Sequence, residues 1–158
     1  MTSVLYPGSF DPVHNGHLAL IEQAATIFDR VVVAVGWNPQ KPSGLFDADE
    51  RLAMLGETTS HLPEVELARF SGLVVNAAHD NAVDAIIKGL RGVIDFDGEV
   101  EQARMNEATS GVPTLFLPAE PAQGFVAAKY VREISRLGGD VSSIVPPAVL
   151  ARLQERFS

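Results

Sequence analysis

The stretch SVLYPGSFDPVHNGHLALIEQAATIFDRVVVAVG, residues 3–36, places two apolar runs on either side of a segment with helical periodicity. Residues 3–6 form the first run, which we expect to be a buried strand that Pro7 and Gly8 end. The apolar residues that follow recur at helical spacing and predict a helix over about residues 15–29. Residues 30–36 are continuous and rich in valine, which is typical of a parallel strand covered on both faces. This order of strand, helix and strand indicates an α/β fold.

The rest of the chain continues the alternation. Further helices are predicted over about residues 47–61, 73–78, 96–110 and 126–137, with a last one after Pro146 and Pro147. Further strands are predicted at residues 65–68, 84–88 and 114–117, and the composition of residues 38–46 indicates a loop. We therefore predict a single domain, residues 1–158, built on a doubly wound, Rossmann-like sheet of about five parallel strands with a C-terminal helical extension.

Composition excludes several classes of function. The 158 residues include 46% hydrophobic and 20% charged residues, which is ordinary for a globular protein. There is no cysteine, which excludes disulfides, thiolate zinc sites and a cysteine nucleophile. No apolar run approaches the roughly 20 residues that cross a bilayer, and the first residues lack the pattern of a signal peptide. We therefore expect a cytoplasmic protein without a membrane partner.

The charge of the chain argues against nucleic acid as a partner. Its net charge is −8 and its pI about 4.9, whereas a nucleic-acid surface needs a basic patch or stripe. Small anionic ligands remain compatible with this charge, because a few cations that converge in a cleft are enough to hold them.

Small and basic residues follow four of the predicted strands. Residues 7–17 follow the first strand, a loop with Lys41 follows the second, Lys88-Gly89-Leu90-Arg91 ends the fourth, and residues 122–125 follow the fifth. In an open α/β sheet, ligands bind beyond the carboxyl ends of the strands. The sequence thus predicts a site for an anion at one edge of the sheet.

The first of these segments contains two histidines at the start of the predicted helix. Gly16 lies in the first helical turn, where we expect the missing side chain to let a phosphate approach the free N–H groups and the positive end of the helix dipole. His14 and His17 are three residues apart, so both can point to one face, where an imidazolium would stabilise negative charge on a phosphate. Two alternatives are half of a metal site and exposed polar residues of a first turn. Asp11 is interpreted as a cap or turn residue.

Motifs in these segments resemble those of a known superfamily. YPGSFDP, residues 6–12, followed by His14-Asn15-Gly16-His17, is similar to the nucleotidyltransferase signature, in which Thr or His precedes x-Gly-His. Lys88-Gly89-Leu90-Arg91, the acidic segment that follows it, Met105-Asn106 and residues 138–141 resemble one family specifically, the phosphopantetheine adenylyltransferases. The resemblance covers essentially the whole chain.

The resemblance implies a reaction. In the family, the phosphate of 4′-phosphopantetheine attacks the α-phosphorus of ATP and yields dephospho-coenzyme A and pyrophosphate, a step of coenzyme A biosynthesis. It also implies that Mg²⁺ arrives with ATP, that no protein metal site is needed, that the protein forms a homo-oligomer, a hexamer in the family, and that coenzyme A is a possible feedback ligand.

The resemblance further implies which residues bind ATP, bind the acceptor and contribute to catalysis. The implied ATP site comprises Ser9, Phe10, His14, His17, Gly89, Leu90, Arg91, Glu99, Gln123, Gly124, Phe125, Val126, Ala127, Ala128 and Lys129. The implied acceptor site comprises Ser9, Lys41, Val74, Lys88 and Asn106. Catalytic roles are implied for His17, Lys41 and Arg91. For Lys41, Glu99 and Val74, ordinary loop, helix-surface and core positions are the alternative interpretations.

The chain departs from the family pattern at two places. Ala127 and Ala128 stand where the family carries serines that meet the ATP phosphates, although Lys129 adds a cation in the same turn. Gly98 stands where many relatives carry Tyr, and nothing in the sequence explains that change. The alanines motivate an alternative, a nucleotide- or coenzyme-binding protein with weak or no catalysis. A nucleotidyltransferase with another phosphorylated acceptor is a further alternative.

Overall fold

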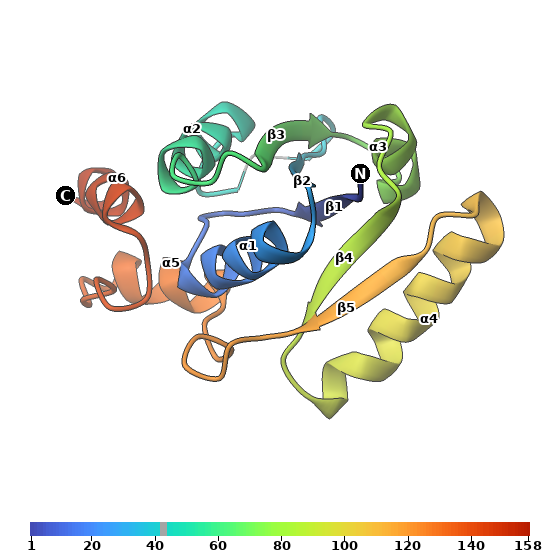
Figure 1. Ribbon diagram of the computed structural model, residues 1–158. Coiled ribbons are helices and arrows are strands. Elements are labelled where there is room, and N and C mark those ends of the chain that lie inside the picture. Colours follow the sequence, from blue (N-terminus) through green and yellow to red (C-terminus); the bar gives the residue numbers. More distant parts are fainter. Residues whose placement is uncertain (42–43) are drawn as a thin grey trace.

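The structure, a computed structural model, describes residues 1–41 and 44–158. Five parallel strands form one sheet in the order β3-β2-β1-β4-β5, and the helices connect them (Figure 1). The strands are β1 (Ser3–Gly8), β2 (Arg30–Gly36), β3 (Val65–Phe70), β4 (Ala85–Leu90) and β5 (Thr114–Pro118). The helices are α1 (Asn15–Ile27), α2 (Ala48–Thr58), α3 (Val74–Asp80), α4 (Val93–Ser110), α5 (Ala128–Arg136) and α6 (Pro147–Phe157). The predicted α/β class, the five parallel strands and the C-terminal helix are confirmed.

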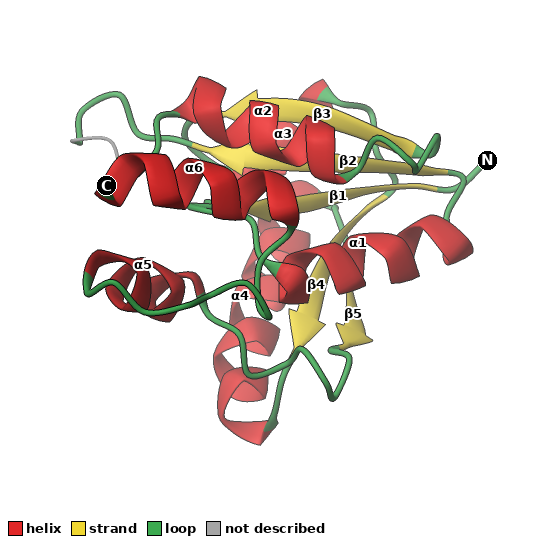
Figure 2. Ribbon diagram, turned by 90° about the vertical axis from the view of Figure 1, so that its left-hand side faces the viewer, coloured by secondary structure: helices red, strands yellow, loops and turns green. Residues whose placement is uncertain are grey.

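The valine-rich strand β2 lies between two hydrophobic cores. Because successive side chains of a strand point to opposite faces, Val31, Val33 and Val35 pack in one core while Val32 and Ala34 pack in the other. The first core also takes residues of α1, α2, α5 and α6, and the second takes residues of α3. Figure 2 shows α6 beside the sheet and close to α2 and α5, which it also contacts.

The strand order reverses direction at β1. The chain runs outward through β2 and β3, returns, and continues on the other side of β1 with β4 and β5. Such a reversal separates the loops after the two central strands and leaves a crevice at their carboxyl ends. The loops after β1 and β4 therefore meet at this point.

Several predicted element ends were wrong. β1 continues through Pro7 to Gly8, because it pairs with β2 over its whole length. Its pairing with β4 covers Val4 and Leu5, so Pro7, which has no N–H, lies past the paired part of that side. α1 ends at Ile27 rather than residue 29, since Asp29 turns back and accepts hydrogen bonds from Thr2.

The remaining differences are shifts of one to three residues. α2 ends at Thr58, β3 and β4 extend to Phe70 and Leu90, and β5 includes Pro118. α3 is shifted to Val74–Asp80, α4 begins at Val93, and α5 begins at Ala128 and ends at Arg136. Of the predicted loop 38–46, residues 42–43 lie outside the described residues.

Within residues 1–41 and 44–158, no helix is long and apolar enough to cross a membrane.

Candidate active site

A cleft opens where the loops after β1 and β4 meet. α1 contributes its first turns, β4 its carboxyl end, α4 one acidic side chain, and the segment before α5 its turn. The lining residues are Tyr6, Pro7, His14, Gly16, His17, Leu20, Lys88, Gly89, Arg91, Glu99, Ala119, Glu120, Gln123, Gly124 and Val126. Segments far apart in the sequence thus meet at the crevice that the strand order predicts.

The two histidines of α1 stack at the edge of this cleft. Their ring centroids lie 3.6 Å apart, with 23° between the ring planes. His14 is the N-cap residue of α1, and its Nδ1 accepts hydrogen bonds from the backbone N–H of Gly16 at 3.0 Å and of His17 at 3.3 Å. In return, the Nδ1 of His17 accepts a hydrogen bond from the backbone N–H of His14 at 3.1 Å. This reciprocal arrangement is a capping box.

The ring of Phe10 packs against the histidine pair on its buried side. Its side chain is 2% exposed, and its ring packs edge-on against His17 and against Tyr6. Its backbone has a φ of 49°, a left-handed conformation that is unusual for a bulky residue and is tolerated where the surroundings demand it. The predicted Phe10 position is thus in the core beneath the cleft, with the ring fixing one side of His17.

In the unliganded protein, lowered pKa values favour the neutral form of both imidazoles, and the imidazolium expected beside a bound phosphate stays a prediction. Burial, together with the nearby charge of Arg91, lowers the pKa of His14 to about 4. Burial, followed by His14 and Arg91, holds the pKa of His17 well below its ordinary value. Since each Nδ1 accepts a hydrogen bond from a backbone N–H, the single ring proton must sit on Nε2. His17 therefore offers a neutral Nε2–H donor, and the positive charge of the cleft comes from Arg91 and Lys88.

Gly16 lines the cleft, where the expected approach of a phosphate stays a prediction, and its missing side chain also leaves room for protein atoms. A Cβ at this position would lie 2.9 Å from Cε1 of His14 and 3.1 Å from the carbonyl oxygen of Gln123. Such distances leave no space for a methyl group unless the ring or the turn moves. The missing side chain thus makes room for the His14 ring and for the turn before α5, which closes the cleft.

Lys88 faces a carboxylate in the cleft, and Arg91 ties two of the cleft walls together. Nζ of Lys88 lies 3.7 Å from Oε2 of Glu99, which is buried and has no hydrogen-bond partner in the described part of the chain. Arg91 donates a hydrogen bond from Nη1 to the carbonyl oxygen of Val126 at 3.2 Å, which ties the end of β4 to the turn before α5. Oε1 of Gln123 is buried and lacks a partner among the described residues as well. The cleft therefore holds fixed charges and polar atoms that a ligand would satisfy.

A second hollow continues from the cleft on the side of β2. It is lined by Pro7, Gly8, Ser9, Gly36, Trp37, Asn38, Phe70, Val74 and Lys88. Pro7 and Lys88 line both spaces, so the two adjoin at the end of β1. A neighbouring hollow, which Ser9 also lines, includes Lys41, Arg51 and Arg69.

The structure brings most of the predicted site residues together in these two places. The cleft takes His14, His17, Gly89, Arg91, Glu99, Gln123, Gly124 and Val126, and Lys88 lies between it and the hollows. Ser9, Lys41 and Val74 line the hollows. Ser9, which was placed at both ligands, thus lies on the hollow side.

Other predicted site residues line none of these spaces in the described part of the chain. They are Phe10, Leu90, Asn106, Phe125, Ala127, Ala128 and Lys129. Phe125 is 71% exposed, and Nζ of Lys129 lies 4.7 Å from the ring centroid of Tyr130, so this lysine packs along its own helix. α5 begins at Ala128 with Ala127 as its N-cap, so the alanines and Lys129 form the start of this helix, directly after the turn that lines the cleft.

Sequence reasoning missed several lining residues. Leu20 lies one turn after His17 on α1, so the helical period pointed to it. Ala119 and Glu120 directly follow β5, and Trp37 and Asn38 directly follow β2, so their place after strands was the available signal. Asp11 is not a simple turn residue, because its carboxylate is buried and accepts hydrogen bonds from the backbone N–H groups of Leu45 and Phe46.

Comparisons with known proteins agree with the geometry. Residues 5–134 match the model of the cytidylyltransferase-like family. The chain is 49% identical over 158 residues, 100% of its length and 99% of the relative's, to a phosphopantetheine adenylyltransferase of a Nocardioides species. It is 45% identical over 156 residues, 99% of its length and 98% of the relative's, to a phosphopantetheine adenylyltransferase of Corynebacterium diphtheriae.

Proposed function

The chain belongs to the phosphopantetheine adenylyltransferase family, and from that premise we propose that it transfers the adenylyl group of ATP to 4′-phosphopantetheine, giving dephospho-coenzyme A and pyrophosphate. One observation supports this most: the cleft with His17 and Arg91 and the hollow with Ser9 join at Pro7 and Lys88. Two phosphorylated ligands that enter from the two sides would meet there. The named relatives favour an enzyme over a binding protein without catalysis.

The reaction needs little acid–base chemistry from the protein. A phosphate oxygen of the acceptor forms a bond to the α-phosphorus of ATP, while the bond from that phosphorus to the bridging oxygen breaks and pyrophosphate leaves with the electron pair. The second pKa of a phosphate monoester is about 6, so the acceptor is ionised at neutral pH. The protein therefore contributes position and charge stabilisation, as in phosphoryl transfer generally.

The charges of the cleft suit the transferred group. His17 donates from its neutral Nε2–H to an oxygen on the α-phosphorus, where negative charge grows in the transition state. Arg91 supplies positive charge on the ATP side, and Lys88 supplies it where the two spaces join. The backbone of Gly89 and Leu90, together with His14, Glu99 and the segment from Gln123 to Lys129, would hold the rest of ATP.

The acceptor would occupy the hollows beside β2. Lys41 and Ser9 bind its phosphate there, and Val74 provides an apolar contact for the pantetheine arm. Asn106 of α4 would contact the acceptor only after a movement, because it lines none of the spaces described above.

Mg²⁺ would enter with ATP. Among the described residues, no group of three or more His, Asp or Glu side chains is arranged to hold a metal ion. Mg²⁺ keeps several waters and is commonly bound through substrate phosphates. When bound, it would neutralise part of the phosphate charge, and Arg91 and Lys88 would neutralise the rest.

Three further properties complete the proposal. A homo-oligomer, a hexamer as in the family, is supported by exposed apolar side chains on the outer elements, including Met105 of α4 and Leu115 of the edge strand β5. Light scattering would test it. Coenzyme A shares the pantetheine arm and the adenosine of the product, so we propose that it competes at the same site. A cytoplasmic location follows from the proposed place in coenzyme A synthesis.

The test is pyrophosphate release from purified protein with ATP, Mg²⁺ and 4′-phosphopantetheine, each omitted in turn. We expect release only when all three are present, with dephospho-coenzyme A formed in equal amount. Release with other phosphorylated acceptors at a similar kcat/KM would contradict the acceptor assignment. Binding of both ligands without any release would instead favour the binding protein.

A further inference from the structure

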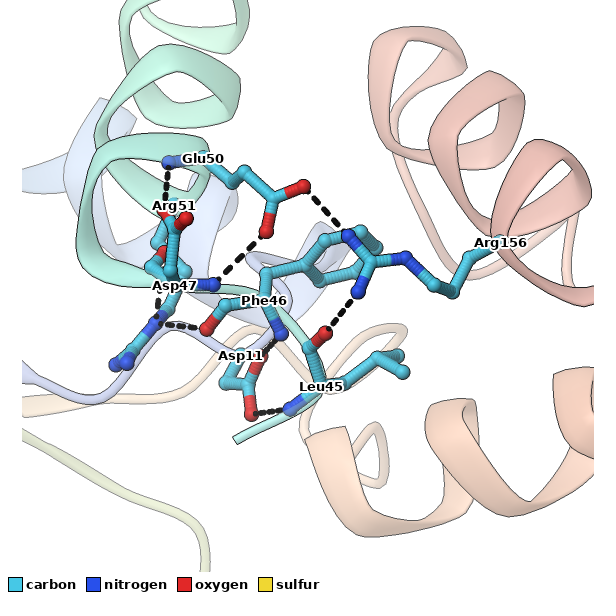
Figure 3. A network of polar contacts seen from close by, with 7 residues as sticks. All are labelled: Asp11, Leu45, Phe46, Asp47, Glu50, Arg51 and Arg156. Atoms are coloured by element: carbon cyan, nitrogen blue, oxygen red, sulfur yellow. Dashed lines mark hydrogen bonds and ion pairs between the residues drawn. The ribbon is translucent and has the colours of Figure 1, made fainter. Parts of the chain in front are cut away.

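Arg51 of α2 is a buried arginine that lines the hollow containing Lys41 and Arg69. It is 7% exposed, and its guanidinium donates hydrogen bonds to backbone carbonyls. Nε donates to Phe46 at 2.9 Å and to Asp47 at 3.3 Å, while Nη1 donates to Ser9 at 3.0 Å and to Gly36 at 3.2 Å. Figure 3 shows the bond to Phe46 beside the contacts that hold the same segment.

These carbonyls belong to three separate segments. Gly36 is the last residue of β2, and Phe46 directly precedes the N-cap of α2, so the two mark the ends of the loop that contains Lys41. Ser9 begins the loop after β1, on the opposite side of the hollow. One guanidinium therefore joins both ends of the Lys41 loop to each other and to the loop that faces it.

The other contacts of this loop do not join its two ends. The carboxylate of Asp11 accepts hydrogen bonds from Leu45 at 2.8 Å and Phe46 at 2.9 Å, and Arg156 of α6 donates to the carbonyl oxygen of Leu45 at 2.8 Å (Figure 3). All of these hold the end nearest α2. At the other end, Trp37 donates to the carbonyl of Phe70 on β3. In the described part of the chain, Arg51 is the side chain that spans both ends.

The chemistry of the clamp requires a guanidinium. Among the described residues, no carboxylate oxygen lies within 4.0 Å of the nitrogens of Arg51, so its direct partners are backbone carbonyls. Burying a charge without a counter-ion is costly, and a simple structural contact does not need it. A planar fork with five N–H donors reaches several carbonyls in fixed directions, which the single ammonium of lysine cannot do.

We propose that Arg51 is a positioning residue for the acceptor. By clamping both ends of the Lys41 loop to the Ser9 carbonyl, it fixes the distance between Lys41 and Ser9 across the space that the acceptor phosphate enters. The ATP cleft is built mainly from α1, β4 and the turn before α5, and Arg51 is not among the residues that line it. The inference rests on the proposed function, because Lys41 and Ser9 are assigned to the acceptor there.

The experiment uses Arg51→Lys, which keeps the charge and loses the fork. Trp37 is the only tryptophan of the chain and directly follows Gly36 in the same loop, so its fluorescence reports on the loop. We expect the Kd for 4′-phosphopantetheine, measured by titrating Trp37 fluorescence without ATP, to rise at least tenfold. We expect the Kd for ATP, measured by calorimetry, to stay within twofold, and the fluorescence anisotropy of Trp37 to fall.

Arg152→Lys is the matched control. Arg152 also contacts α2, where it pairs with Glu57 from the side of α6, and it lies outside every space described above. We expect both dissociation constants and the anisotropy to match the parent. If Arg51→Lys does not fold, Arg51→Gln, which keeps an amide donor without charge, is measured in the same way with the same expectation.

The outcomes separate this inference from the proposed function. Parent protein that binds no 4′-phosphopantetheine or forms no dephospho-coenzyme A contradicts the proposed function. An active parent whose Arg51→Lys variant binds the acceptor as tightly as before overturns the role of Arg51. Equal weakening of both ligands, or failure of both variants to fold, assigns Arg51 to general stability and overturns the inference as well.

Discussion

His14 and His17 each cap the backbone of the other. Nδ1 of His14 accepts a hydrogen bond from the N–H of His17 at 3.3 Å, and Nδ1 of His17 accepts one from the N–H of His14 at 3.1 Å. The first turn of α1 thereby fixes the tautomer of both rings, since a nitrogen that accepts from an N–H cannot carry a proton. Helix capping and the proposed phosphate contact use opposite sides of the same imidazole.

The first prediction concerns this tautomer. We expect long-range ¹H–¹⁵N spectra of the unliganded protein to show His14 and His17 as neutral rings protonated at Nε2 between pH 6 and 8, because burial and Arg91 lower the pKa of both. His61, which is half exposed beside Glu22 at 3.0 Å, provides the internal comparison. A signal from doubly protonated His17 at pH 6 would contradict the assignment.

The second prediction is a pH dependence of stability. The unfolded chain takes up a proton at His14 near pH 6.5, whereas the folded protein does so only near pH 4. Stability is therefore complete above pH 6.5 and is lost as the pH falls toward 4. The contribution of His14 at pH 5 amounts to a loss of about 2 kcal/mol relative to pH 7. His14→Asn keeps an N-cap acceptor and cannot titrate. Urea unfolding at pH 7 and pH 5 should show that the free energy of unfolding falls less in the variant than in the parent, by about 2 kcal/mol. An equal fall in both proteins would contradict the lowered pKa of His14.

The third prediction separates His17 from ATP binding. His17→Ala should reduce kcat by about 10²–10³-fold, the cost of removing one preorganised donor to a developing charge. The Kd for ATP should change much less, because Arg91, Lys88 and the turn before α5 remain. Steady-state kinetics and calorimetry measure the two quantities, and His61→Ala serves as the control. An unchanged kcat would remove His17 from the mechanism.

The strand positions and the place of the site followed from sequence because both depend on local patterns. The continuous valine-rich run of β2 and the residues directly after each strand predicted the sheet and the edge at which the cleft opens. The role of Arg51 could not be predicted in this way, since it depends on backbone carbonyls of three segments that only the tertiary fold brings together. The lowered pKa values of the two histidines could not be predicted either, because they depend on burial and on the charge of Arg91 in the folded protein.

The fourth prediction tests the close approach at Gly16. Alanine is favoured over glycine inside a helix by about 0.8–1.0 kcal/mol, so Gly16→Ala would stabilise α1 if space were available. The new methyl group would instead meet the His14 ring and the carbonyl of Gln123. We expect no gain in the free energy of unfolding and an ATP affinity at least tenfold weaker. Gly98→Ala is the matched control, because a Cβ there meets nothing within 4 Å. Its free energy of unfolding should rise by the full preference of a helix for alanine over glycine. Equal increases in the free energy of unfolding of the two variants would show that the turn before α5 moves to accommodate the methyl group.

The fifth prediction concerns the alanines at the start of α5. Ala127 is the N-cap of this helix, with φ −134° and ψ 136°, and no side chain caps the free N–H groups. A serine adopts this conformation readily, and a capping hydroxyl is worth about 0.5–2 kcal/mol relative to alanine. Ala127→Ser should therefore raise the free energy of unfolding by that amount, as measured by urea titration. Because Val126, the preceding residue, lines the cleft and accepts a hydrogen bond from Arg91, a more stable helix start should also tighten ATP binding by a few-fold.

Ala128→Ser is the control for this prediction. Residue 128 lies inside the helix and cannot act as the N-cap, so this variant separates the effect of capping from a direct contact with ATP. Tighter ATP binding in Ala128→Ser without added stability would mean that a hydroxyl reaches the phosphates directly. Gains confined to Ala127→Ser would mean that the cap acts through the helix start.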